Sequence, residues 1–152
     1  MAGENVYVVR SYFDALDRWL AAYWSDPQQP IGEVPGLHEV DKHLLTDVEW
    51  DWLFSPETFR GRDQLLEAVS DWLETVDDWR IEVDELVDGT QDRALVIGRV
   101  RARGKGSGVP IRQALFTAVT VKDGKVARIE DHTDRASGLK AVGLAELGTA
   151  RH

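Results

Sequence analysis

Cysteine is absent from the 152 residues of this chain. Its absence excludes a disulfide framework, a thiolate nucleophile, and any metal or iron–sulfur site held by cysteine. A chain of this length buries roughly 70% of its unfolded surface around one core, so it needs no such cross-link. A reducing compartment is the simplest setting, and we predict a cytoplasmic protein.

Long hydrophobic runs are also missing. No stretch approaches the roughly 20 apolar residues that cross a bilayer. The N-terminal segment MAGENVYVVRSYFDALDR mixes acidic and basic residues where a signal peptide would have an apolar core. We therefore expect an unexported protein with no membrane partner.

Positive charge is in short supply. The chain has 18 basic and 27 acidic residues, which gives a net charge of -9. Such a charge repels a phosphate backbone, so we expect no nucleic-acid partner. The basic run RVRARGK over residues 99–105 is more typical of one solvated or salt-bridged strand face than of a nucleic-acid groove.

Tryptophan, by contrast, is abundant, with six residues in the chain. Side chains of this size indicate either a roomy aromatic core or a cavity lined by aromatic rings, and composition alone does not separate the two.

Hydrophobic periodicity predicts that helices occupy the first half of the chain. Apolar residues at helical spacing, bounded by Pro- and Gly-containing segments, favour three helices around one short strand. The predicted helices span Glu4–Trp24, Leu37–Leu45 and about Arg62–Val76, and the strand spans Asp47–Phe54.

From Trp79 onward the period changes from 3.6 to 2, which predicts four successive strands. The last two are joined by Asp123-Gly124, a strong signal for a tight hairpin turn. Helices grouped ahead of an antiparallel meander indicate an α+β domain with the helices on one face of a curved sheet. We assign residues 1–144 to a single domain and 145–152 to a frayed tail.

Five strings in this order and spacing carry a resemblance that covers nearly the whole chain. They are ENVYVVRSYFDAL, LLTDVEWDW, TFRGRDQLLEAVSDWL, RVRARGKGSG and DGKVARIEDHTDRASGLKAVGL. Together they resemble the SnoaL-like branch of the NTF2-like superfamily. The resemblance implies a cone-shaped α+β fold whose curved antiparallel sheet and helices enclose a pocket. Function varies widely on this fold, so it must be argued from the site.

The resemblance implies an apolar pocket lining suited to a flat ring. We predict that Trp50, Trp52, Phe59 and Trp79 form it, with Tyr23 of the first helix also in contact with ligand. The alternative is that these rings fill the cone and leave no cavity.

Asp131 is the first candidate for an acid or base, because SnoaL-like cyclases and related epoxide hydrolases are similar in placing a catalytic Asp at this point of the last strand. Strand alternation places Asp131 inward and His132 outward. A one-residue bulge would instead turn Glu130 and His132 inward, which makes His132 the second catalytic candidate. The same resemblance implies an inward Arg99 beside Asp131. If the protein is an enzyme, we expect Arg99 to stabilise the oxyanion that develops on the substrate, with Arg101 as a further ligand contact. The second Asp of the hydrolases is replaced by Arg101, which counts against epoxide hydrolysis.

Two hypotheses of function follow. The first is a cyclase-, isomerase- or dehydratase-type enzyme that acts on an apolar cyclic substrate by general acid/base catalysis, with no metal and no organic cofactor. The second is a non-catalytic module that binds a small hydrophobic or aromatic ligand, in which Asp131 pairs with Arg99 or fixes the ligand. We also predict a homodimer through the convex sheet face, because Val96, Val100 and Val119 would make that face apolar.

Overall fold

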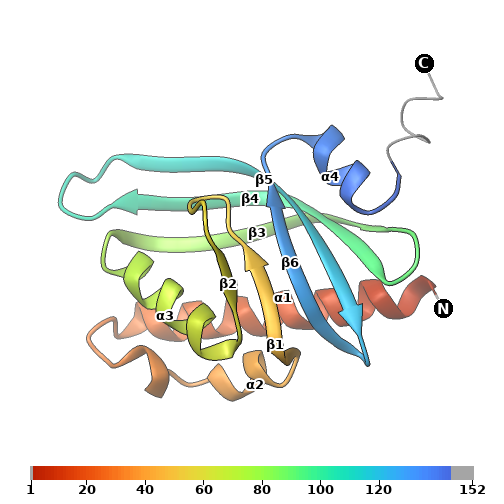
Figure 1. Cartoon of the computed structure of the whole chain (residues 1–152). Helices are drawn as coiled ribbons and strands as arrows, with labels where there is room; N and C mark the ends of the chain where they lie inside the picture. Colours follow the sequence, from red (N-terminus) through yellow and green to blue (C-terminus); the bar gives the residue numbers. More distant parts are fainter. Residues whose placement is uncertain (1, 145–152) are drawn as a thin grey trace.

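The computed structural model describes residues 2–144, so the predicted tail at 145–152 lies outside the described residues. The first half contains three helices, a short 3-10 turn and two strands, and the second half contains four strands and a closing helix (Figure 1). In chain order the elements are α1 (Ala2–Ser25), η1 (Ile31–Glu33), α2 (Leu37–Asp41), β1 (Leu44–Asp51), β2 (Thr58–Arg60), α3 (Arg62–Leu73), β3 (Val76–Asp88), β4 (Arg93–Gly104), β5 (Pro110–Lys122), β6 (Lys125–His132) and α4 (Arg135–Ala141).

The strands form one sheet in the order β2-β1-β6-β5-β4-β3. Strands β3 to β6 pair as successive antiparallel neighbours, as the sequence predicts. The exception to the antiparallel pattern is the pairing of β1 with β6, which is parallel and sets Trp50 opposite Ile129. This pairing brings the aromatic end of β1 beside the segment that carries Asp131.

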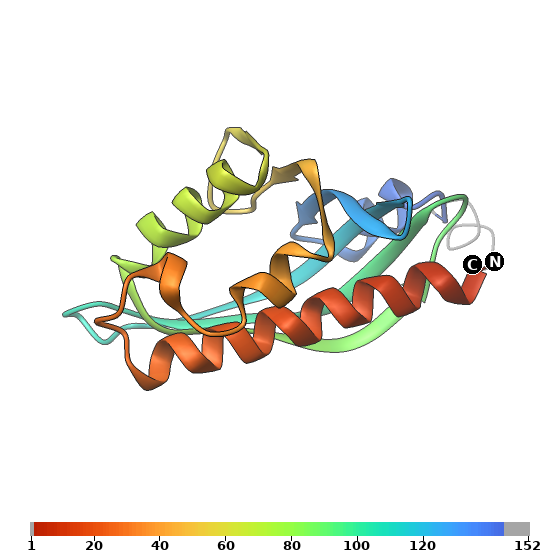
Figure 2. The same cartoon turned by 90° about the horizontal axis from the view of Figure 1, so that it is seen from below.

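Helices α1, α2 and α3 lie on the concave side of the curved sheet, which we call the pocket face. Figures 1 and 2 show α1 running along the sheet, and residues of all three helices line the same cavity. Helix α4 packs on the opposite, outer face, where Leu95, Ala118 and Val142 form a separate small cluster. The α+β class and the NTF2-like cone are thereby confirmed.

The predicted apolar outer face is wrong. Val96, Val100 and Val119 are at most 3% exposed and belong to the main core on the pocket face. Both alternating rows of β4 begin with apolar residues, so alternation alone does not decide which row faces inward. The homodimer stays a prediction without this argument, and sizing with light scattering tests it.

The observed elements differ from the sequence prediction in several places. Strand β1 spans Leu44–Asp51 where the prediction was Asp47–Phe54, α3 ends at Leu73, and β3 begins at Val76. The second helix ends at Asp41 because β1 already begins at Leu44 and pairs with β6. Strand β2 was not predicted, since three residues are too few to show a period. No helix among residues 2–144 has both the length and the apolar character needed to cross a membrane.

Candidate functional site

A pocket lies between the concave face of the sheet and helices α1 to α3. Its cavity volume is about 70 Å³, and the wider space of about 760 Å³ includes the opening to solvent. Most lining side chains are apolar or aromatic, as is usual for small-molecule sites. The charged groups in the lining are Asp41, Arg62 and Asp131.

Asp131 reaches the pocket from the end of β6 and is fixed by two hydrogen bonds. The Leu53 N–H donates to Oδ2 at 3.2 Å, and the Thr117 hydroxyl donates to Oδ1 at 3.0 Å. Thr117 stands opposite Asp131 on β5 and is 1% exposed. The carboxyl group is therefore held by one neighbour on each side of β6.

Burial raises the pKa of the Asp131 carboxyl above its ordinary range. Hydrogen bonds from Leu53, Thr117 and the Trp50 side chain act in the opposite direction, because they stabilise the charged form. The effect of burial is larger, although part of the residue surface stays accessible. A carboxyl group in this state can donate or accept a proton nearer to neutral pH than an ordinary Asp.

Tyr12 lines the same pocket from α1 and is 6% exposed. Burial raises the pKa of its hydroxyl above the ordinary value, and the negative charges of Asp131 and Asp41 raise it further. The phenol therefore stays protonated at all ordinary pH values. It is a neutral hydrogen-bond donor within electrostatic reach of both acids.

Asp41 and Arg62 form a second polar part of the lining, where α2 and α3 approach the start of β1. The Arg62 Nη2 group donates a hydrogen bond to the Leu44 carbonyl. Burial raises the pKa of Asp41, while the positive charge of Arg62 acts to lower it. The pocket thus has an acid with a raised pKa on both β6 and α2.

The predicted aromatic lining is present in part. Trp50, Trp52 and Trp79 line the pocket, and Trp50 stacks on Trp52 with 4.7 Å between ring centroids. Phe59 packs against these two stacked rings but lies outside the lining. Tyr23 is 8% exposed in the core and also lies outside it.

The predicted inward position of Arg99 is wrong, and so is the ligand contact predicted for Arg101. The Arg99 side chain is 58% exposed on the outer face and donates hydrogen bonds to Asp84 at 3.0 and 3.2 Å. Arg101 is 53% exposed and pairs with Glu82. Val100, between them, faces the pocket. The predicted arrangement, with Arg99 and Arg101 inward, and the observed one, with Val100 inward, differ by a shift of one residue along β4.

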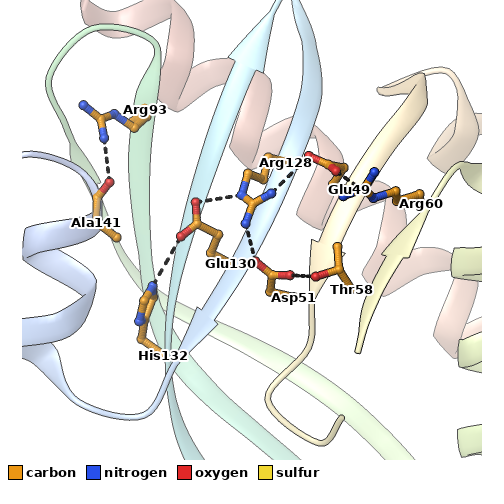
Figure 3. A network of polar contacts seen from close by, with 9 residues as sticks. All are labelled: Glu49, Asp51, Thr58, Arg60, Arg93, Arg128, Glu130, His132 and Ala141. Atoms are coloured by element: carbon orange, nitrogen blue, oxygen red, sulfur yellow. Dashed lines mark hydrogen bonds and ion pairs between the residues drawn. The ribbon is translucent and has the colours of Figure 1, made fainter. Parts of the chain in front are cut away.

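His132 lies on the outer face, in the polar network shown in Figure 3. Arg128 is its centre and pairs with Glu49, Asp51 and Glu130, the first and last at 3.0 and 2.9 Å. The His132 Nε2 atom lies 3.8 Å from Glu130 and has no hydrogen-bond partner among residues 2–144. The alternative in which a bulge turns His132 inward is therefore wrong. The register shift between β5 and β6 lies at Thr120 and Val121, and Asp131 still lines the pocket.

Three polar residues of the pocket carried no role in the sequence prediction: Thr117, Arg62 and Asp41. Thr117 had a usable signal, since it is a polar residue between the apolar residues Leu115 and Val119 of the inward row of β5. Arg62 and Asp41 gave none, because a charged residue at a helix end is usually solvated. In the described part of the chain, no group of three or more His, Cys, Asp and Glu side chains is arranged to hold a metal ion.

Comparison with known proteins gives one family and a consistent fold. The family model for the SnoaL-like domain matches residues 9–129. An NTF2-like protein of unknown function from Burkholderia pseudomallei K96243 is similar with a TM-score of 0.66 at 20% identity, over 92% of this chain and 98% of that one. No match was found among curated protein sequences.

Two further structures are similar in fold and carry names of enzymes. A putative ketosteroid isomerase from Kribbella flavida DSM 17836 matches with a TM-score of 0.59 at 22% identity, over 88% of this chain and 80% of its own. An LEH-like epoxide hydrolase of M. tuberculosis matches with a TM-score of 0.61 at 13% identity, over 98% and 96%. At these identities the likeness concerns the fold alone.

Proposed function

Since the chain belongs to the SnoaL-like domain family, we propose that it is a small-molecule enzyme that acts on an apolar cyclic substrate by general acid/base catalysis. The proposed chemistry is of the cyclase, isomerase or dehydratase type and needs neither a metal nor an organic cofactor. The observation that supports it best is Asp131, a carboxyl group with a raised pKa that lines an aromatic pocket.

In this proposal Asp131 moves the proton. Its ionised form accepts a proton from the substrate, and its protonated form returns one to a substrate carbon or oxygen. Positioned proton transfer of this kind contributes about 10²- to 10⁴-fold to the rate. The hydrogen bonds from Leu53 and Thr117 hold the carboxyl group in place for the transfer.

Tyr12 takes the role that the sequence prediction gave to Arg99, the stabilisation of negative charge that develops on a substrate oxygen. The hydroxyl is neutral and buried, and it lies within electrostatic reach of Asp131. A donor of this type in a pocket of low polarity stabilises an oxyanion more than it would in water. The rings of Trp50, Trp52 and Trp79 hold the apolar body of the substrate.

The alternative, a module that binds a ligand without converting it, is also supported by an observation. Both oxygens of Asp131 already accept hydrogen bonds within the protein, which suits a structural carboxyl group. Epoxide hydrolysis is disfavoured, since the Arg99 side chain that such chemistry would use lies on the outer face.

The test compares Asp131→Asn with Glu130→Gln, a neighbouring carboxylate on the outer face. A screen of cyclic ketones and phenols by thermal shift supplies ligands, which are then followed for conversion by mass spectrometry. We expect Asp131→Asn to lower turnover at least 100-fold and Glu130→Gln to leave it within twofold. Unchanged turnover in Asp131→Asn, or tight ligands that are never converted, would contradict the proposal.

A further inference from the structure

Three hydrogen-bond donors in the pocket lining have no partner. They are the indole Nε1 atoms of Trp19 and Trp79 and the Nε atom of Arg62, all buried and without a hydrogen bond to any residue of the 2–144 range. Trp19 and Trp79 are each 2% exposed. The other buried side-chain atoms without a hydrogen-bond partner in this range belong to Trp72, Glu82, Asp88 and His132, none of which lines the pocket.

An indole N–H and a guanidinium group donate hydrogen bonds and accept none. Buried donors are nearly always paired in folded proteins, so an unpaired set that shares one cavity indicates that a ligand supplies the acceptors. This chemistry selects oxygen atoms on the ligand and disfavours amino groups. The requirement is independent of whether the ligand reacts.

Arg62 is the charged member of this set. Its Nη2 group is fixed by the Leu44 carbonyl, which orients the guanidinium plane, while Nε stays unpaired. No carboxylate of the described chain lies within 4.0 Å of the Arg62 side chain, although Asp41 is near enough to interact with its charge. A guanidinium group without an ion pair, in a mostly apolar cavity, is suited to a planar oxyanion.

Resting on the proposed function, we infer that the substrate is a ring carboxylate and that Arg62 is the residue that selects its anionic end. The apolar ring then lies along Trp50, Trp52 and Trp79, and the indole N–H groups face further oxygen atoms of the ligand. In this arrangement the carboxylate is the end that binds, and the part near Asp131 is the end that reacts.

Asp41 opposes the anion. It lines the pocket near Arg62, and an ionised carboxylate at this position repels a ligand carboxylate. Burial raises the pKa of Asp41 and so weakens this repulsion at mildly acid pH. Replacement of Asp41 by Asn removes the negative charge and is therefore expected to strengthen binding of the anion.

The test uses three probes with the same fused ring: 2-naphthoate, 2-naphthamide and 2-naphthylmethylammonium. Isothermal titration calorimetry at pH 7 measures the Kd of each for the full chain. We expect 2-naphthoate to bind at least tenfold more tightly than the amide, and the ammonium compound to bind most weakly. In Arg62→Met the ratio between carboxylate and amide is expected to fall close to one, and in Asp41→Asn it is expected to rise.

Two variants serve as controls. Arg60→Met removes an exposed arginine that pairs with Glu49 on the outer face, and it should leave the ratio unchanged. Arg62→Lys keeps the charge without the planar fork and should retain part of the preference if Arg62→Met fails to fold. Equal affinity for the amide, a preference that survives Arg62→Met, or no binding of any probe would each overturn the inference.

The outcome is separable from that of the proposed function, because these measurements require no turnover. If Asp131→Asn leaves turnover unchanged while the carboxylate preference depends on Arg62, the proposed catalysis fails and the inference stands. If the preference does not depend on Arg62 while Asp131→Asn abolishes turnover, the inference fails and the proposed catalysis stands.

Discussion

The Thr117 hydroxyl donates a hydrogen bond of 3.0 Å to Asp131 from the neighbouring strand, and both residues line the pocket. This bond stabilises the ionised carboxylate, whereas burial of the same group favours the protonated form. The state of the candidate acid therefore depends on a residue that is itself almost completely buried.

Replacement of Thr117 by Val removes the donor and retains the shape of the side chain. We expect the pKa of Asp131 to rise further, since one of the hydrogen bonds that stabilise its charged form is lost. The acid limb of the pH–rate profile should move to higher pH. Loss of the bond should also lower the free energy of unfolding at pH 7 by about 1–2 kcal/mol.

Thr117→Ser is the matched control, because it retains the hydroxyl and should keep the pH–rate profile of the wild type. A profile in Thr117→Val that stays superimposable on the wild type would show that this bond does not set the pKa of Asp131.

The stability of the protein should depend on pH through Asp131 with a definite sign. The folded-state pKa lies above the ordinary value of 3.8, so Asp131 is protonated in both states at lower pH. As pH rises through the folded-state pKa, ionisation costs more in the folded protein than in the unfolded chain. The free energy of unfolding of the wild type should therefore fall relative to Asp131→Asn between pH 4 and pH 7, as measured by urea denaturation.

Asp134 provides a control of opposite sign. Hydrogen bonds from Ser137 to this N-terminal cap of α4 lower the pKa of Asp134 below 3.8. Its contribution to stability is present above pH 3.8 and is lost as pH falls through the folded-state pKa. The difference in free energy of unfolding between the wild type and Asp134→Asn should therefore shrink on acidification. In the comparison with Asp131→Asn, the wild type should instead become relatively more stable on acidification. If stability changed with pH in the same way for both variants relative to the wild type, the opposite pKa shifts of Asp131 and Asp134 would be contradicted.

The fold was predictable to a large extent because its signals are local. Alternation identified β4, β5 and β6, the Asp123-Gly124 turn fixed the last hairpin, and helical spacing identified α1 and α3. The inward orientation of Asp131 followed from parity along a strand whose own register is regular at that point.

The rest of the site depended on information that does not lie within one segment. Both rows of β4 carry apolar residues, so the choice between Arg99 and Val100 as the inward residue rests on packing against α1 and on the bulges of β3. Arg62 and Asp41 come together only because α2 and α3 flank the start of β1. The periodicity of neither helix predicts that these two side chains lie close together.

The outer network should contribute to stability through Arg128. This side chain is 35% exposed and pairs with three carboxylates from two strands, so Arg128→Gln leaves three negative charges close together. We expect the free energy of unfolding to fall by about 1–2 kcal/mol at low salt, discounted for partial exposure. The loss should be smaller at high salt, because ions screen the repulsion.

Arg103→Gln is the control for this prediction, since Arg103 is 57% exposed and, within residues 2–144, forms an ion pair only with Asp78. It should cost less than about 0.5 kcal/mol. Equal losses in the two variants would show that the network adds nothing beyond an ordinary surface pair.

Gly98 should be irreplaceable because the backbone of β4 lies very close to that of β3 at this residue. It pairs with Val83 beside a bulge in β3, and a Cβ atom at this position would overlap the Glu82 carbonyl. Gly98→Ala forces the two strands apart, and a comparable overpacking costs about 1–3 kcal/mol. The change also moves Val100 and Ile81, which line the pocket, so the affinity for ring ligands should fall together with the melting temperature.

Gly32→Ala is the appropriate comparison, because a Cβ atom there meets nothing within 4 Å. Its melting temperature should match that of the wild type. If Gly98→Ala also melted like the wild type, the close approach of β4 to the bulge would not be a constraint on the sheet, and the curvature that closes the pocket would have to arise elsewhere, for example from the register shift between Thr120 and Val121.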